Sequence, residues 1–145
     1  MTAIISGDSM ENEEISTAQL KTSWAISPEW FQKNSRALLP VVREYLCPKC
    51  AGNLAKKKKN NSTDAVMSAI HNCCSRSPDF INDRLPVLES IFRLFLANGN
   101  QPLGVEELGR QLIELRSGDS YRTSPEILSR ILKNDTYYGL QEVSA

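Results

Sequence analysis

The side chains best suited to chemistry in this 145-residue chain are four cysteines and one histidine. Cys47 and Cys50 form a C-x-x-C pair, and His71, Cys73 and Cys74 follow after an interval of twenty residues. Two residues between thiolates allow both sulfurs to reach one tetrahedral ion at about 2.3 Å, while backbone amides donate to the sulfurs. The spacing therefore predicts a structural Zn²⁺ site.

Five candidate side chains compete for the four positions of such an ion. The sequence predicts a helix over residues 64–74, on which His71 and Cys74 lie three residues apart and point the same way. Cys73 falls on the apolar stripe of that helix and is predicted to be a small buried residue. If the helix ends before the adjacent cysteines, both can bind, and Cys73 replaces His71. The favoured ligand set is Cys47, Cys50, His71 and Cys74.

Other roles for these cysteines fit the sequence less well. No secretory signal and no long apolar run is present, which predicts a cytoplasmic protein without a membrane span, where reduced thiols favour metal over disulfides. A redox C-x-x-C motif is typically surrounded by alternating strands and helices, a pattern that the sequence around Cys47 and Cys50 does not show. A zinc deaminase needs His-x-Glu and a proline before its C-x-x-C, but Asn72-Cys73 follows His71 and Leu46 precedes Cys47. We predict no enzymatic activity and no small-molecule substrate.

The elements that must position these ligands are predicted to be short helices in a zinc-binding region over residues 24–80. An acidic tail over residues 1–23 precedes it and is predicted to be disordered. Ser27-Pro28-Glu29 is typical of a helix start, because serine caps free amides and proline fits the first position. Pro40 removes an amide from the following apolar run and predicts a kink or two short helices. Residues 51–61 are predicted to be a mobile loop.

The region over residues 85–145 has the periodicity of three helices, which favours a winged helix-turn-helix with a small β wing. Asn98-Gly99 ends the first helix, and Ser124-Pro125-Glu126 opens the third. The fold class is thus predicted to be mainly α, with the helical zinc-binding segment packed on this C-terminal domain. The predicted elements are helices over 85–96, 105–115 and 124–134, an extended segment over 121–123, and a strand or hairpin over 137–143.

Three motifs in this region carry a family resemblance. They are Asn98-Gly99-Asn100-Gln101-Pro102-Leu103, Glu106-Glu107-Leu108 and Thr123-Ser124-Pro125-Glu126. Together with the apolar first helix, they resemble the HARE-type winged helix, the family that includes the N-terminal domain of the delta subunit of bacterial RNA polymerase. The resemblance covers residues 85–143 and implies contact with DNA or with transcription machinery.

The distribution of charge leaves two kinds of partner open. The formal net charge is zero, but residues 24–100 carry eleven basic and six acidic side chains, whereas residues 101–145 carry five and seven. A DNA-associated transcriptional regulatory factor is the leading functional prediction. A non-enzymatic protein–protein adaptor on the same scaffold is the alternative, which the acidic C-terminal region favours. The candidate DNA contacts are Lys56, Lys57, Lys58, Lys59, Arg122, Arg130 and Lys133.

Overall fold

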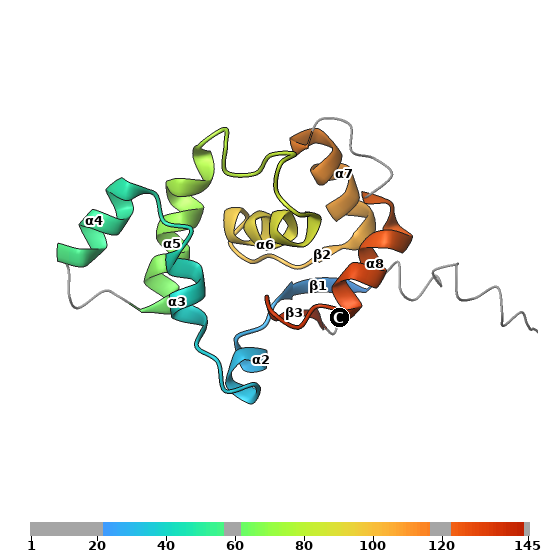
Figure 1. Ribbon diagram of the computed structural model, residues 1–145, viewed down its shortest axis with the longest axis horizontal. Helices are drawn as coiled ribbons and strands as arrows, with labels where there is room; N and C mark the ends of the chain where they lie inside the picture. Colours follow the sequence, from blue (N-terminus) through green and yellow to red (C-terminus); the bar gives the residue numbers. More distant parts are fainter. Residues whose placement is uncertain (1–21, 57–61, 117–122, 144–145) are drawn as a thin grey trace, which may run out of the picture.

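Seven helices and three short strands account for most of residues 22–56, 62–116 and 123–143, which are the residues that this computed structural model describes (Figure 1). The prediction of a mainly α protein is confirmed. The helices are α2 (Pro28–Lys33), α3 (Leu38–Arg43), α4 (Pro48–Lys56), α5 (Thr63–Asn72), α6 (Val87–Ala97), α7 (Val105–Leu115) and α8 (Pro125–Lys133), with a 3-10 turn η3 (Cys74–Arg76). The strands are β1 (Ser23–Ile26), β2 (Leu103–Gly104) and β3 (Leu140–Val143).

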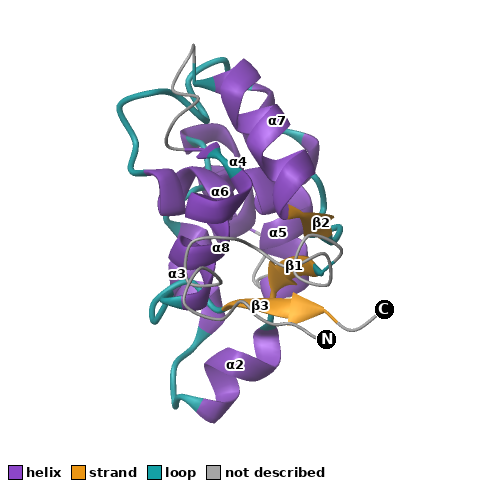
Figure 2. Cartoon of the chain, turned by 90° about the vertical axis from the view of Figure 1, so that its right-hand side faces the viewer, coloured by secondary structure: helices purple, strands orange, loops and turns teal. Residues whose placement is uncertain are grey.

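The three strands form one antiparallel sheet in the order β2-β1-β3, so the central strand comes from the start of the described chain (Figure 2). Ser23 pairs with Gly104 of β2, and Ile26 pairs with Leu140 of β3. The hairpin considered for residues 137–143 does not form within the described residues, because β3 pairs with β1 instead. Ser23 thus belongs to the sheet rather than to the predicted tail, while residues 1–21 lie outside the described residues.

The two regions predicted from the sequence share this sheet and one hydrophobic core. Buried side chains from Trp24 to Leu140 form a single cluster. Helix α6 is central to it, because Phe92 and Phe95 are fully buried and the helix lies between α5 and α7 (Figure 1). The boundary predicted between residues 80 and 85 therefore does not separate two cores.

A side chain replaces part of the strand pairing at the end of β1. The amide of Ile26 donates to Asn100 Oδ1 at 2.9 Å, and Asn100 Nδ2 donates to the carbonyl of Ile26 at 2.9 Å. Asn100 has a φ of 59°, in the left-handed region that asparagine tolerates better than most residues. The turn after α6 is thereby fixed to the sheet.

The helices before the cysteines follow local signals in part. Ser27 caps α2 by accepting the amide of Trp30 at 3.2 Å, as predicted. The apolar run forms two short helices, with the break near Ser35, whose φ is 55°. Pro40 then falls in the first turn of α3, where its missing amide breaks no helical bond.

Part of the loop predicted over residues 51–61 is helical, which corrects that prediction. Helix α4 begins at Pro48 and continues to Lys56. Its inner face carries buried Cys50 and half-buried Leu54, which packs against the core. Packing of this face compensates for Gly52, a poor helix former that lies exposed in the middle of α4. Residues 57–61 lie outside the described residues.

Candidate metal centre

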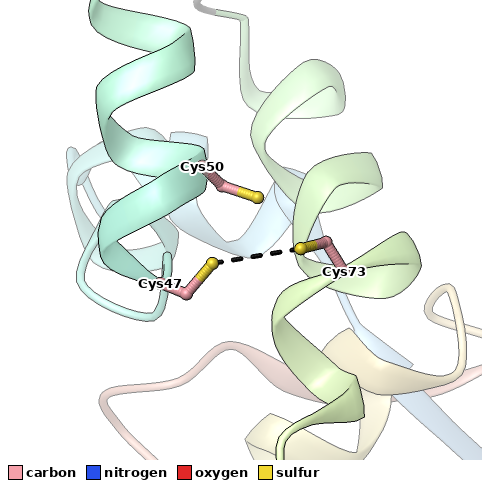
Figure 3. A group of neighbouring side chains, drawn as sticks. All are labelled: Cys47, Cys50 and Cys73. Atoms are coloured by element: carbon pink, nitrogen blue, oxygen red, sulfur yellow. Dashed lines mark hydrogen bonds between the residues drawn. The ribbon is translucent and has the colours of Figure 1, made fainter.

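Three sulfur atoms meet where the start of α4 faces the end of α5. The Sγ atoms of Cys47, Cys50 and Cys73 all lie within 4.8 Å of one another and point toward a common centre (Figure 3). The Cys47 and Cys73 sulfurs are 4.0 Å apart. A tetrahedral ion with metal–sulfur bonds of about 2.3 Å separates its ligand sulfurs by about 3.8 Å. The cluster therefore has dimensions that suit a metal ion, whereas a disulfide requires about 2.05 Å between sulfurs.

The C-x-x-C pair has the local structure of a metal-binding turn. Cys47 immediately precedes α4, and the carbonyl of Cys47 accepts the amide of Ala51 at 2.9 Å, so the chain turns into the helix between the two cysteines. The backbone amide of Cys50 is the largest influence that lowers the pKa of the Cys47 thiol to about 7. An amide that stabilises the thiolate in this way also stabilises a thiolate bound to a metal.

Cys74 lies beside the three-sulfur group. Its Sγ accepts the backbone amide of Cys47 at 3.1 Å, and its side chain is buried. Burial raises the pKa of Cys74 and of Cys50. A buried thiolate needs a compensating positive charge, which a bound metal ion supplies. Cys74 is not part of the group of sulfurs that lie within 4.8 Å of one another, but its Sγ is held against the backbone of Cys47.

His71 is not brought to the sulfurs. Its Nδ1–H donates to the backbone carbonyl of Ala97 at 2.7 Å, and its ring packs beside Gly99 at the end of α6. The geometry brings Cys73, the alternative ligand of the sequence analysis, to Cys47 and Cys50, and it does not bring the favoured His71 there. That choice assumed a helix through Cys74, but α5 ends at Asn72, and Cys73 has φ −133° and ψ −63°. Leaving the helix turns both adjacent cysteines toward α4.

The chemistry available to this cluster is metal binding by thiolates. Within the described residues, the group that could hold an ion consists of sulfurs alone, without an imidazole or a carboxylate. Half-buried Tyr45, Leu54 and Met67 pack against the hydrophobic core. The arrangement brings the start of α4 to the end of α5.

The predicted DNA contacts are distributed over the molecule. Arg130 and Lys133 are exposed on α8, and Lys56 is exposed at the end of α4. Helices α4 and α8 lie toward opposite ends of the long axis, so Lys56 is not brought together with the other two (Figure 1). The remaining candidates, Lys57, Lys58, Lys59 and Arg122, lie outside the described residues.

Comparison of the chain with protein-family models, with curated proteins and with solved structures gave no match. The resemblance of residues 85–143 to the HARE-type winged helix therefore stays a prediction. No helix in the described parts of the chain combines the length and the apolar character needed to cross a bilayer.

Proposed function

We propose that this protein is a non-enzymatic, zinc-stabilised regulatory factor that contacts duplex DNA through α8. The observation that carries the proposal is that two basic side chains of the C-terminal region are exposed and unpaired among the described residues. Arg130 and Lys133 are exposed and lie three residues apart, on one face of α8, and neither forms an ion pair with a described carboxylate. They can therefore replace counterions at DNA phosphates.

The other described cations of this region are already engaged. Arg93 pairs with Glu89 at 2.6 Å. Arg110 pairs with Glu107 and, at 2.8 Å, with Glu114. Arg116 is 2% exposed and donates to the backbone carbonyl of Asn82 at 3.2 Å. Among the described residues of this C-terminal region, the positive charge that is open to a partner thus lies on α8, although the region as a whole is acidic.

The packing of α7 against α8 supports the use of α8 as a recognition helix. A Cβ atom on Gly109 of α7 would lie 2.4 Å from the carbonyl oxygen of Thr123, so the chain enters α8 in direct contact with α7. Strand β2 precedes this helix pair and β3 follows it. In a winged helix-turn-helix, the second helix of such a pair enters the major groove. Here β1, rather than a hairpin partner, lies beside β3.

In this proposal Zn²⁺ is structural, and four thiolates hold it. The 4.0 Å separation of the Cys47 and Cys73 sulfurs and the place of Cys74 beside Cys47 support this ligand set. Helix α4 is nine residues long and would be unstable in isolation. A metal bond at its first turn ties it to α5. The proposed ligands are Cys47, Cys50, Cys73 and Cys74.

The DNA proposal is tested by binding of the zinc-loaded full chain to random-sequence duplex DNA over a series of salt concentrations. Phosphate contacts make the logarithm of the association constant fall linearly with the logarithm of salt, by about 0.9 per contact. Arg130→Gln and Lys133→Gln should each reduce the magnitude of that slope by about 0.9, the value for one lost phosphate contact. Arg84→Gln, an exposed arginine before α6, is the matched control and should leave it unchanged. Absence of binding at low salt would exclude the proposal.

One observation favours the adaptor as a second candidate. Ile113 and Leu115 of α7 are 40% and 44% exposed, and Leu115 lines a pocket of about 240 Å³ with Phe80, Ile81 and Leu94. Exposed apolar side chains beside a pocket with apolar and polar lining residues are typical of protein contact surfaces. If the adaptor is correct, Leu115→Ser should abolish capture of a protein partner from cell extract. The DNA salt series would then show no binding.

A further inference from the structure

The guanidinium of Arg36, between α2 and α3, is held by aromatic rings beside the turn that follows α8. Its central carbon lies 4.4 Å from the ring centre of Tyr137, 5.4 Å from that of Phe31 and 5.6 Å from that of Trp30. Its Nη1 donates to the backbone carbonyl of Tyr137 at 2.7 Å. Stacking and the hydrogen bond together fix the plane of the guanidinium.

The turn beneath Arg36 is rigid, because a buried carboxylate organises it. Asp135 Oδ1 accepts the amides of Tyr137 and Tyr138, each at 2.9 Å, and Asp135 Oδ2 accepts the amide of Leu140 at 2.9 Å. Gly139 completes the turn with a φ of 66°. Arg36 is therefore attached to a fixed support that begins two residues after α8.

The same turn places Arg36 close to the basic end of α8. Tyr137 follows Lys133 by four residues, and a fully extended chain of that length spans at most about 14 Å. Each strand of duplex DNA presents one phosphate per about 3.4 Å along the helix axis, so this distance corresponds to about four nucleotide steps. Lys133 and the support of Arg36 thus lie within reach of one DNA strand.

We propose that Arg36 is a further phosphate contact of the duplex bound by α8, an inference that rests on the proposed function. Arg36 is half-buried and forms no ion pair with a described carboxylate, and Tyr137 beside it is 48% exposed. A guanidinium has five N–H donors, so the bond to Tyr137 leaves donors for a phosphate. Its planar fork matches phosphate oxygens, and prior stacking reduces the side-chain entropy lost on contact.

Two substitutions of Arg36 test the inference with the zinc-loaded full chain and random-sequence duplex DNA. Arg36→Gln should flatten the salt dependence by about 0.9 in the log–log slope, the loss of one phosphate contact. Arg36→Lys keeps the charge and should retain the slope, with weaker binding because the fork is lost. Arg43→Gln, an exposed arginine of α3, is the matched control and should leave both slope and affinity unchanged.

A structural role alone predicts a different outcome. If Arg36→Gln lowers the melting temperature but keeps the wild-type salt slope, Arg36 only supports the turn, and the inference is overturned. Binding that still depends on Arg130 and Lys133 would in that case leave the α8 proposal standing. If the wild-type protein does not bind the duplex at low salt, the α8 proposal fails, and the Arg36 contact fails with it.

Discussion

The imidazole of His71 donates its Nδ1 hydrogen to the backbone carbonyl of Ala97 at 2.7 Å and so joins α5 to the last turn of α6. The carbonyls of a last helical turn have no partner within the helix, and His71 satisfies one of them. The chain then turns through Gly99 to Asn100, whose side chain holds Ile26 of β1. Hydrogen bonds and a short turn thus connect the end of α5, just before the sulfur cluster, with the central strand.

Substitution of His71 should lower stability without removing the metal. His71→Ala leaves the Ala97 carbonyl without its side-chain donor, which should reduce the free energy of unfolding by about 1 kcal/mol. Denaturant unfolding measures this loss. The visible spectrum of the Co²⁺-substituted variant should equal that of the wild type, since the proposed ligands are all thiolates. A changed spectrum would restore His71 to the ligand set.

Removal of the metal should loosen the sulfur cluster before the rest of the fold. Purified reduced protein should contain about one equivalent of zinc by elemental analysis. After chelation, hydrogen exchange should accelerate first in α4, because that helix loses its link to Cys73, and later in the core helix α6. Cys73→Ser should reproduce this pattern, whereas Ser77→Ala, in the nearby turn, should retain zinc. Protein that contains no metal despite careful reduction would contradict the site.

The pKa of Cys47 predicts selective alkylation in the metal-free protein. The Cys50 amide lowers the pKa of Cys47 to about 7, whereas burial raises that of Cys74. The thiolate is the reactive form, so iodoacetamide should modify Cys47 first, at a rate that rises as the pH increases toward 7 and levels off above it. Mass spectrometry of peptides identifies the modified residue. Bound zinc should suppress the reaction, and equal rates at all four cysteines would contradict the prediction.

Local sequence signals predicted the starts of α2 and α8, because their capping hydrogen bonds lie within one turn. The side chains of Ser27 and Ser124 each accept the amide three residues later. The end of α5 lies at Asn72, two residues before the predicted end at Cys74, and this difference brings Cys73 rather than His71 to the other sulfurs. The pairing of β1 with β3 joins residues more than one hundred positions apart, and neither strand carries a signal for the other.

Asn100 was missed because its role combines an unusual backbone conformation with a distant partner. Asn100→Ala should cost about 2–4 kcal/mol, since the Ile26 amide and carbonyl lose their partners and alanine disfavours a positive φ. Asn100→Gly separates these causes, because glycine accepts the conformation but makes neither bond. In denaturant unfolding, Asn100→Gly should lower the free energy of unfolding by about 1 kcal/mol less than Asn100→Ala does. Equal stability of the wild type and both variants would show that the two hydrogen bonds between Asn100 and Ile26 do not stabilise the fold.

Two helical glycines should respond in opposite directions to the same substitution. Gly52 lies exposed in α4, and an added Cβ would meet nothing within 4 Å. Gly52→Ala should therefore stabilise the protein by up to about 1 kcal/mol through helix propensity. Gly109 lies in α7, where the same Cβ would stand 2.4 Å from the Thr123 carbonyl oxygen. Gly109→Ala must push the start of α8 away from α7, and it should destabilise by about 1–3 kcal/mol.

The same pair of variants connects the α7–α8 contact to DNA binding. A displaced α8 presents Arg130 and Lys133 in a changed position, so Gly109→Ala should weaken duplex binding even at temperatures where the variant is folded. Gly52→Ala changes a helix at the other end of the long axis and should bind as the wild type does (Figure 1). Circular dichroism confirms folding of both variants before the titration. Unchanged affinity of folded Gly109→Ala would mean that the position of α8 does not determine binding.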